Sequence, residues 1–194
     1  MKLISWNIRG INGLSKHRMI HRKVTQEKPR VLMIQETKCS SSTLDALEAR
    51  LWKGSHSITV DAEGASGGLV ILWNPAEIIL DNFLATSHTI TASFQFMGSG
   101  VQGFITNVYG PQLPVQKALF LDYMSSLGQQ INMQHWIVSG DFNMITSLEE
   151  KKGGRRHLEQ EGEAFSDVIE QLHMVDMKTS NGVFTWNNRR GGEH

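Results

Sequence analysis

Cysteine, excess charge of either sign and long apolar runs are all scarce in this sequence. Cys39 is the only cysteine of the 194 residues, so no disulfide can form within the chain, and a reducing, intracellular setting is favoured. The apolar run at the N-terminus is too short for a signal peptide, and no stretch approaches the length of a membrane span. Lys and Arg number 19 and Asp and Glu also 19, so the net charge of zero indicates no particular partner. We expect a soluble, intracellular protein that does not bind a membrane.

Positive charge is nevertheless concentrated in two segments. Six basic residues lie between Lys16 and Arg30 against the single acidic Glu27, and a second basic group follows at Lys151–His157. Each segment is interpreted either as a solvated face or as a contact for nucleic acid. The second interpretation gains weight where the segments flank an acidic metal site.

The stretch Trp136–Asn143 combines a strand pattern with polar side chains at its end. Its first three residues are bulky and apolar, as in a buried strand, Gly140 permits a tight exit, and Asp141 and Asn143 follow. The two polar side chains share one side of the chain if the backbone stays extended. An Asx-rich turn explains the same residues, and this stretch alone does not decide between a turn and a site.

Other strand-like runs also end in polar side chains, among them the runs that lead to Asn7, Glu36 and Tyr109. We expect these side chains to converge on one rim of an α/β (α+β) fold, in which helices flank two packed, mostly antiparallel sheets. Residues 1–194 are expected to form one domain. The predicted strands are Lys2–Trp6, Val31–Ile34, Ile58–Val60, Leu69–Trp73, Ile78–Phe83, Thr89–Phe96, Gly103–Tyr109, Trp136–Val138 and Val183–Trp186, and apolar periodicity predicts helices over His17–Lys28, Leu44–Leu51, Val115–Ile131 and Phe165–Leu172.

Six short motifs carry a resemblance to a known family. In chain order they are SWNIRG at Ser5–Gly10, IQETK at Ile34–Lys38, SGG at Ser66–Gly68, YGP at Tyr109–Pro111, GDFN at Gly140–Asn143 and FTW at Phe184–Trp186. Their order and spacing resemble the endonuclease/exonuclease/phosphatase superfamily, whose DNase I-like and exonuclease III-like members fold as a four-layer sandwich. Two further segments, EKKGGRR at Glu150–Arg156 and TWNNRRGGEH at Thr185–His194, resemble most closely the endonuclease domain of plant LINE-type retrotransposon polyproteins.

The resemblance implies metal-dependent hydrolysis of phosphodiesters by five residues. Glu36 is the expected ligand of Mg²⁺, for which Mn²⁺ can substitute, because this hard cation favours one or two carboxylates plus water. Asn7 supports the metal through its amide, and Asp141 lies against the metal and orients or deprotonates the attacking water. Asn143 holds the phosphate or the water, and the Tyr109 hydroxyl donates to a phosphate oxygen. A tyrosine that only packs in the core stays an alternative for Tyr109.

The partner implied by the resemblance is DNA, held through its backbone. Arg9, Lys38, Arg155 and Arg156 are expected to contact phosphates in a sequence-independent and salt-sensitive way, with Thr185 as a lesser contact. The protein is expected to be a monomer. Its expected location, taken over from the retroelement role, is the nucleus.

The chain departs from the family's pattern at its C-terminus. Relatives continue beyond the position of His194 with an aspartate that helps to fix the active site and with a terminal Ser-Asp-His, and neither follows here. We therefore expect a C-terminally truncated domain that lacks its last strands, leaves Lys2–Trp6 on an aggregation-prone open edge and turns over slowly or not at all. Two alternatives stay open: a catalytically dead retroelement remnant, and a phosphoesterase that acts on small molecules or lipids.

Overall fold

The computed structural model describes residues 2–64, 66–132, 135–150 and 160–177. The chain divides into two compact units, of which the first holds Met1–Gly110 with Met133–Phe142 and the second holds Pro111–Asn132 with Asn143–His194. None of the described helices is both long and apolar enough to cross a membrane. The strand predicted at Val183–Trp186 lies outside the described residues, and the single domain over residues 1–194 stays a prediction.

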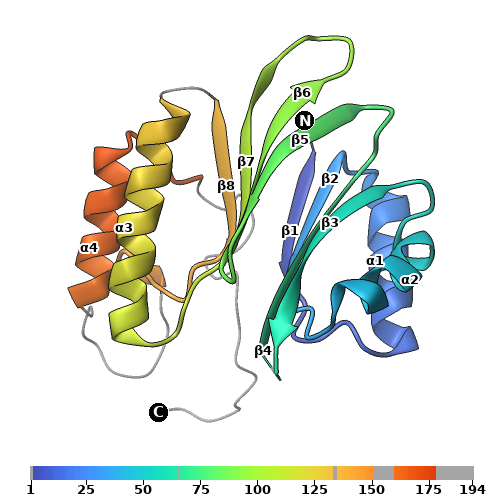
Figure 1. Cartoon of the computed structure of the whole chain (residues 1–194), viewed down its shortest axis with the longest axis horizontal. Helices are drawn as coiled ribbons and strands as arrows, with labels where there is room; N and C mark the ends of the chain where they lie inside the picture. The colour runs from blue at the N-terminus through green and yellow to red at the C-terminus, as the bar shows by residue number, and fades with distance from the viewer. Residues whose placement is uncertain (1, 65, 133–134, 151–159, 178–194) are drawn as a thin grey trace. The chain divides into compact units, whose positions relative to one another are not determined.

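The first unit begins with a four-stranded sheet built around one fully buried strand. Its strands are β1 (Leu3–Asn7), β2 (Val31–Gln35), β3 (His56–Glu63) and β4 (Ser66–Trp73). They lie in the order β1-β2-β4-β3, with β1 parallel to β2 and the other pairs antiparallel (Figure 1). Because β2 is apolar on both faces, it is buried along its whole length, as its unbroken apolar run predicts.

Helices α1 (Leu14–Glu27) and α2 (Ser41–Leu51) cover the outer face of this sheet (Figure 1). α2 begins after Ser40, whose hydroxyl accepts a hydrogen bond from the Thr43 N–H at 3.4 Å and so caps the helix. α1 ends before Pro29 as predicted but begins at Leu14, earlier than the predicted His17. The cluster between the helices and the sheet includes Ile20, Val24, Leu44, Leu51, Leu32, Ile34, Val70 and Leu72.

A second four-stranded sheet belongs to the same unit. It consists of β5 (Ile78–Ala85), β6 (Thr89–Phe96), β7 (Gln102–Tyr109) and β8 (Trp136–Asp141), in that order. The first three strands are consecutive and antiparallel, whereas β8 pairs with β7 in parallel. The sequence predicts Gly140 at the exit of the strand, but the structure places it inside β8. Glycine is required there because a Cβ would overlap the backbone of Val108 on β7.

The two sheets pack face to face and share one apolar core, which confirms the expected pair of mostly antiparallel sheets. Among the described strands, β1 pairs only with β2, and its apolar side chains Leu3, Ile4 and Trp6 are half-buried, in agreement with an open edge. The core side chains include Val31, Met33, Leu69 and Ile71 from the first sheet and Ile78, Ile90, Phe94 and Ile105 from the second.

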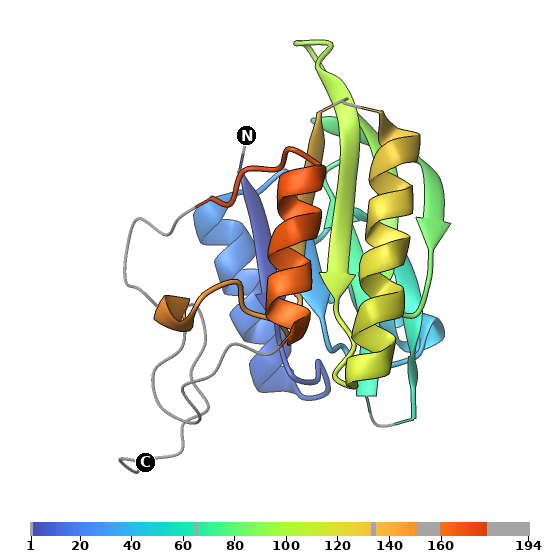
Figure 2. The ribbon, with the colours of Figure 1, turned by 90° about the vertical axis from the view of Figure 1, so that its left-hand side faces the viewer.

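The second unit contains α3 (Pro114–Ile131), a short 3₁₀ helix η1 (Leu148–Glu150) and α4 (Gln160–Gln171). Helices α3 and α4 lie side by side (Figure 2). Pro114 stands in the first turn of α3, where its missing N–H breaks no hydrogen bond within the helix. The apolar stripe predicted for α3 is buried at Phe120, Met124, Leu127 and Ile131.

Candidate active site

The register of the parallel strand pairs brings polar strand ends together in the first unit. Asn7 at the end of β1 is opposite Gln35 at the end of β2, and Glu36 follows directly. In the second sheet, Tyr109 at the end of β7 is opposite Asp141 at the end of β8. Because parallel strands end at the same edge, each sheet delivers its polar residues to one rim, as the sequence predicts.

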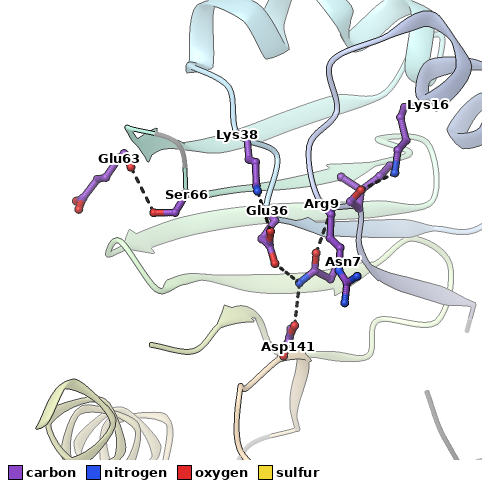
Figure 3. A network of polar contacts seen from close by, with 9 residues as sticks. Asn7, Arg9, Lys16, Glu36, Lys38, Glu63, Ser66 and Asp141 are labelled. Carbon is purple, nitrogen blue, oxygen red and sulfur yellow. Dashed lines mark hydrogen bonds and ion pairs between the residues drawn. The ribbon is translucent and has the colours of Figure 1, made fainter. Parts of the chain in front are cut away.

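A single amide group joins carboxylates from the two sheets (Figure 3). Asn7 Nδ2 donates one hydrogen bond to Glu36 Oε1 and another to Asp141 Oδ2, each at 2.8 Å. Asn7 Oδ1 accepts a hydrogen bond from the main-chain N–H of Arg9 at 3.1 Å, which fixes the orientation of the amide. Two acidic groups 105 positions apart in the sequence therefore lie against the same nitrogen.

The backbone around Glu36 adopts a conformation that L-residues rarely take. Glu36 and Lys38 have φ angles of 52° and 55°, in the left-handed region, where a non-glycine residue costs about 1–3 kcal/mol. Main-chain hydrogen bonds hold this segment: the Thr37 and Lys38 N–H groups donate to the oxygens of Gly68 and Gly67, each at 3.1 Å. This clamp aims the Glu36 carboxylate at Asn7.

Gly68 of β4 explains why the SGG motif needs glycine. Its φ is +84°, and a Cβ at this position would overlap the Thr37 hydroxyl and come within 3.2 Å of the Lys38 nitrogen. The close approach of β4 to the Glu36 segment therefore depends on the missing side chain.

Charged side chains of both signs lie at the site. The Lys38 ammonium lies 3.4 Å from Glu36 Oε2, and its side chain is 39% exposed against 16% for Glu36. Lys38 thus faces the Glu36 carboxylate, and Asn7 is a neutral donor between Glu36 and Asp141. Within the described ranges, His, Cys, Asp and Glu form no cluster of three or more that could hold a metal. Two carboxylates and an amide do not suit Zn²⁺, which favours His and Cys, but they fit Mg²⁺, which keeps several waters.

Two of the predicted catalytic residues are placed differently from the expectation. Tyr109 is buried, with 8% exposure, in the core between the sheets, and its N–H donates to the His88 oxygen at 2.9 Å. This burial agrees with the alternative of a core tyrosine. Asn143 belongs to the second unit and has a φ of 54°, so the backbone beyond Asp141 is not extended as the shared-side interpretation required.

The predicted nucleic-acid contacts are only partly within the described residues. Arg9 and Lys38 are both exposed, and Figure 3 shows both beside Asn7 and Glu36. Arg155, Arg156 and Thr185 lie outside the described residues.

Three residues near the site carry contacts that sequence reasoning did not anticipate. Lys16, which belongs to the basic segment Lys16–Arg30, donates from Nζ to the main-chain oxygen of Ile8 at 2.7 Å. Gln35 and Asn107 are buried beneath the rim. The only sequence signal for the latter two is an amide side chain within an otherwise apolar strand.

The sequence matches a family model, and the fold matches solved structures. The model of the endonuclease/exonuclease/phosphatase family matches residues 4–192. No curated protein matches the chain. A 3′ phosphatase from Neisseria, solved with a product DNA hairpin, has a TM-score of 0.67 and 15% identity, over 88% of this chain and 71% of that one.

Two further solved structures share the fold at similar distance. An AP endonuclease from Archaeoglobus fulgidus has a TM-score of 0.66 and 17% identity, over 88% of this chain and 70% of that one. A mannosyl-6-phosphatase from Bacteroides thetaiotaomicron has a TM-score of 0.60 and 16% identity, over 86% of this chain and 70% of that one. The similarity to these structures shows the DNase I-like fold.

Proposed function

The chain belongs to the endonuclease/exonuclease/phosphatase family, and from that premise we propose that it is a Mg²⁺-dependent endonuclease that hydrolyses phosphodiesters of DNA. The observation that carries the proposal is the contact of Asn7 Nδ2 with both Glu36 and Asp141 at 2.8 Å. It places two carboxylates from separate sheets close enough to serve one divalent cation. Mn²⁺ is the expected substitute for Mg²⁺.

The three residues have separate tasks in this proposal. Glu36 and Asp141 supply carboxylate oxygens to the cation, and Asn7 supports the site through its amide. The cation, when bound, neutralises the phosphate and lowers the pKa of a coordinated water. Asp141 orients the attacking water and accepts its proton at a carboxylate oxygen.

The substrate's phosphates would be held by donors around these carboxylates. We assign Arg9 and Lys38 to the DNA backbone, because both carry positive charge beside the acidic pair. No phosphate contact is assigned to Tyr109, because its side chain packs in the core between the two sheets. Arg155, Arg156 and Thr185 are proposed as further backbone contacts.

DNA is favoured as the substrate by two kinds of support. The similar proteins include an AP endonuclease and a 3′ phosphatase solved with a DNA hairpin. The segments Glu150–Arg156 and Thr185–His194 resemble plant LINE-type endonucleases, so we propose a retroelement origin and a nuclear location. The similar mannosyl-6-phosphatase supports a second candidate, a phosphoesterase of small molecules.

A substrate panel tests the proposal. Supercoiled plasmid, single-stranded RNA and mannose 6-phosphate are each incubated with the folded chain in Mg²⁺ and in EDTA. We expect slow nicking of the plasmid in Mg²⁺ and none in EDTA. Phosphate release from the sugar without nicking would favour the small-molecule phosphoesterase, and no turnover of any substrate would favour a catalytically dead remnant.

A further inference from the structure

A polar layer lies beneath the candidate site, within the otherwise apolar core between the two sheets. Gln35 on β2 is 1% exposed, and Asn107 on β7 is 0% exposed. Gln35 Nε2 donates to Asn107 Oδ1 at 2.6 Å, which joins the two sheets directly. Asn107 Nδ2 donates to the main-chain oxygens of Ile34 on β2 at 3.2 Å and of Val70 on β4 at 3.1 Å. One side chain of the second sheet is therefore bonded to two strands of the first.

On the side of the first sheet, this layer is attached to the strands that carry the site. Gln35 Nε2 also donates to the hydroxyl of Ser5 on β1 at 3.1 Å. Ser5 precedes Asn7 by two residues on β1, and side chains two apart lie on the same face of a strand. Gln35 directly precedes Glu36. A shift of Gln35 therefore moves both the amide and one carboxylate of the site.

In the second sheet, Asn107 lies close in the strand register to Asp141, the other carboxylate of the site. Asn107 is the parallel partner of Ser139, and Asp141 follows Ser139 by two residues on β8. The bond between Gln35 and Asn107 thus joins the sheets one step below the contact that Asn7 makes with Asp141.

The layer restricts how the two sheets can move because hydrogen bonds are directional and apolar contacts are not. If one sheet slid along the other, the amide donors of Gln35 and Asn107 would lose their acceptors in a buried place that water does not reach. An unpaired buried donor is costly, so a single arrangement of the sheets is strongly favoured.

We propose that Gln35 and Asn107 are positioning residues that set the separation of Glu36 and Asp141 by joining the two sheets. The proposal deepens the proposed function, on which it rests, since it names what holds the two carboxylates beside the same Asn7 amide. Neither residue touches the substrate or the cation.

The test uses volume-conserving variants and a matched control. Asn107→Leu removes the three hydrogen bonds that Asn107 makes between the sheets. Gln35→Met is the milder change, since it leaves both donor contacts of Asn107 in place. The control is Thr91→Val: Thr91 is 4% exposed, and its hydroxyl lies 3.0 Å from that of Thr106, so the bond joins β6 and β7 within one sheet.

Two readouts are taken on the full chain. The first is solvent exchange of the Asn7 side-chain amide protons by NMR in EDTA, with Asn7→Ala to assign the signal. The second is the dissociation constant for Mn²⁺. We expect exchange to be about tenfold faster or more, and Mn²⁺ binding about tenfold weaker or more, in Gln35→Met and Asn107→Leu. In Thr91→Val, both should stay within about twofold of the original chain.

The outcomes separate this inference from the proposed function. A folded Gln35→Met variant that keeps both values within about twofold would overturn the positioning role. If the unmodified chain binds no Mn²⁺, the proposed function fails, and the exchange rate of the Asn7 amide alone decides the positioning role. If Thr91→Val changed amide exchange and Mn²⁺ binding as much as Gln35→Met does, the positioning role would also be overturned, because any loosening of the core would then have the same effect.

Discussion

Replacing one carboxylate of the candidate site should change the response to Mg²⁺ far more than the stability of the metal-free protein. Glu36 and Asp141 each place an oxygen 2.8 Å from Asn7 Nδ2, so the two charges lie about 5 Å apart. At an effective dielectric constant of about 20, their repulsion is at most about 3 kcal/mol. In Glu36→Gln this repulsion is lost, but so are a charge-assisted hydrogen bond and the partly exposed ion pair with Lys38. The opposing contributions leave a net change within about 1 kcal/mol in EDTA.

The Mg²⁺ response of Glu36→Gln follows from linkage between binding and folding. At a Mg²⁺ concentration of about 100 times the dissociation constant, the unmodified chain gains about 2.7 kcal/mol of unfolding free energy. Loss of one of two carboxylate ligands should weaken binding about a hundredfold, a factor that outer-shell residues already reach. The same Mg²⁺ concentration then adds only about 0.4 kcal/mol to the variant.

Urea unfolding followed by tryptophan fluorescence, in EDTA and in Mg²⁺, measures both values. The matched control is Glu77→Gln, because the Glu77 carboxylate also accepts from an Asn amide, that of Asn74 at 3.0 Å, and from Arg30 Nε at 2.7 Å. This control should lose stability equally with and without Mg²⁺ and keep the full gain. Equal gains in Mg²⁺ for Glu36→Gln and the unmodified chain would refute the assignment of Glu36 as a ligand.

Three further predictions concern single positions. Gly68→Ala should lower the unfolding free energy by about 2–4 kcal/mol, because the added Cβ would overlap Thr37. Gly64→Ala should lower it by only about 1 kcal/mol, because Gly64 has a φ of +62° but no atom lies within 4 Å of the added Cβ. Equal losses of stability in urea unfolding would contradict this difference. Burial raises the pKa of the Cys39 thiol, so less thiolate is present at a given pH. At pH 8, the thiol of the folded protein should therefore react with a disulfide reagent at least about ten times more slowly than the thiol of the denatured protein. Equal rates would exclude a buried thiol. Lys38→Gln should reduce the slope of log affinity for duplex DNA against log salt by about 0.9, and an unchanged slope would remove Lys38 from the DNA contacts.

The pattern of apolar residues was sufficient to predict most of the fold, and it failed where polar residues lie inside elements. The run at Val31–Ile34 was recognisable as a buried strand, and it is buried throughout in β2. The strand expected at Ile58–Val60 extends over His56–Glu63, because its ends alternate towards solvent with polar side chains. The first turn of α1 was missed since Leu14 is exposed and no apolar stripe includes it.

The candidate site was predictable in its composition but not in its contacts. Motif order singled out Asn7, Glu36 and Asp141, and the structure brings them together. A single sequence does not reveal which buried amides face each other across two sheets, so the bond between Gln35 and Asn107 became visible only in three dimensions. Likewise, the left-handed backbone of Glu36 depends on tertiary hydrogen bonds that local propensity does not contain.

The most direct test of the central claim is single-turnover nicking of supercoiled plasmid by the unmodified chain, Glu36→Ala, Asp141→Ala and the control Glu77→Gln, each with Mg²⁺ and with EDTA. Folding of every variant is checked first by its unfolding transition. We expect nicking in Mg²⁺ by the unmodified chain and by the control, and none by either alanine variant or in EDTA. Nicking that persists in folded Glu36→Ala and Asp141→Ala, or no nicking by the folded unmodified chain, would contradict a Mg²⁺-dependent nuclease site formed by these two carboxylates.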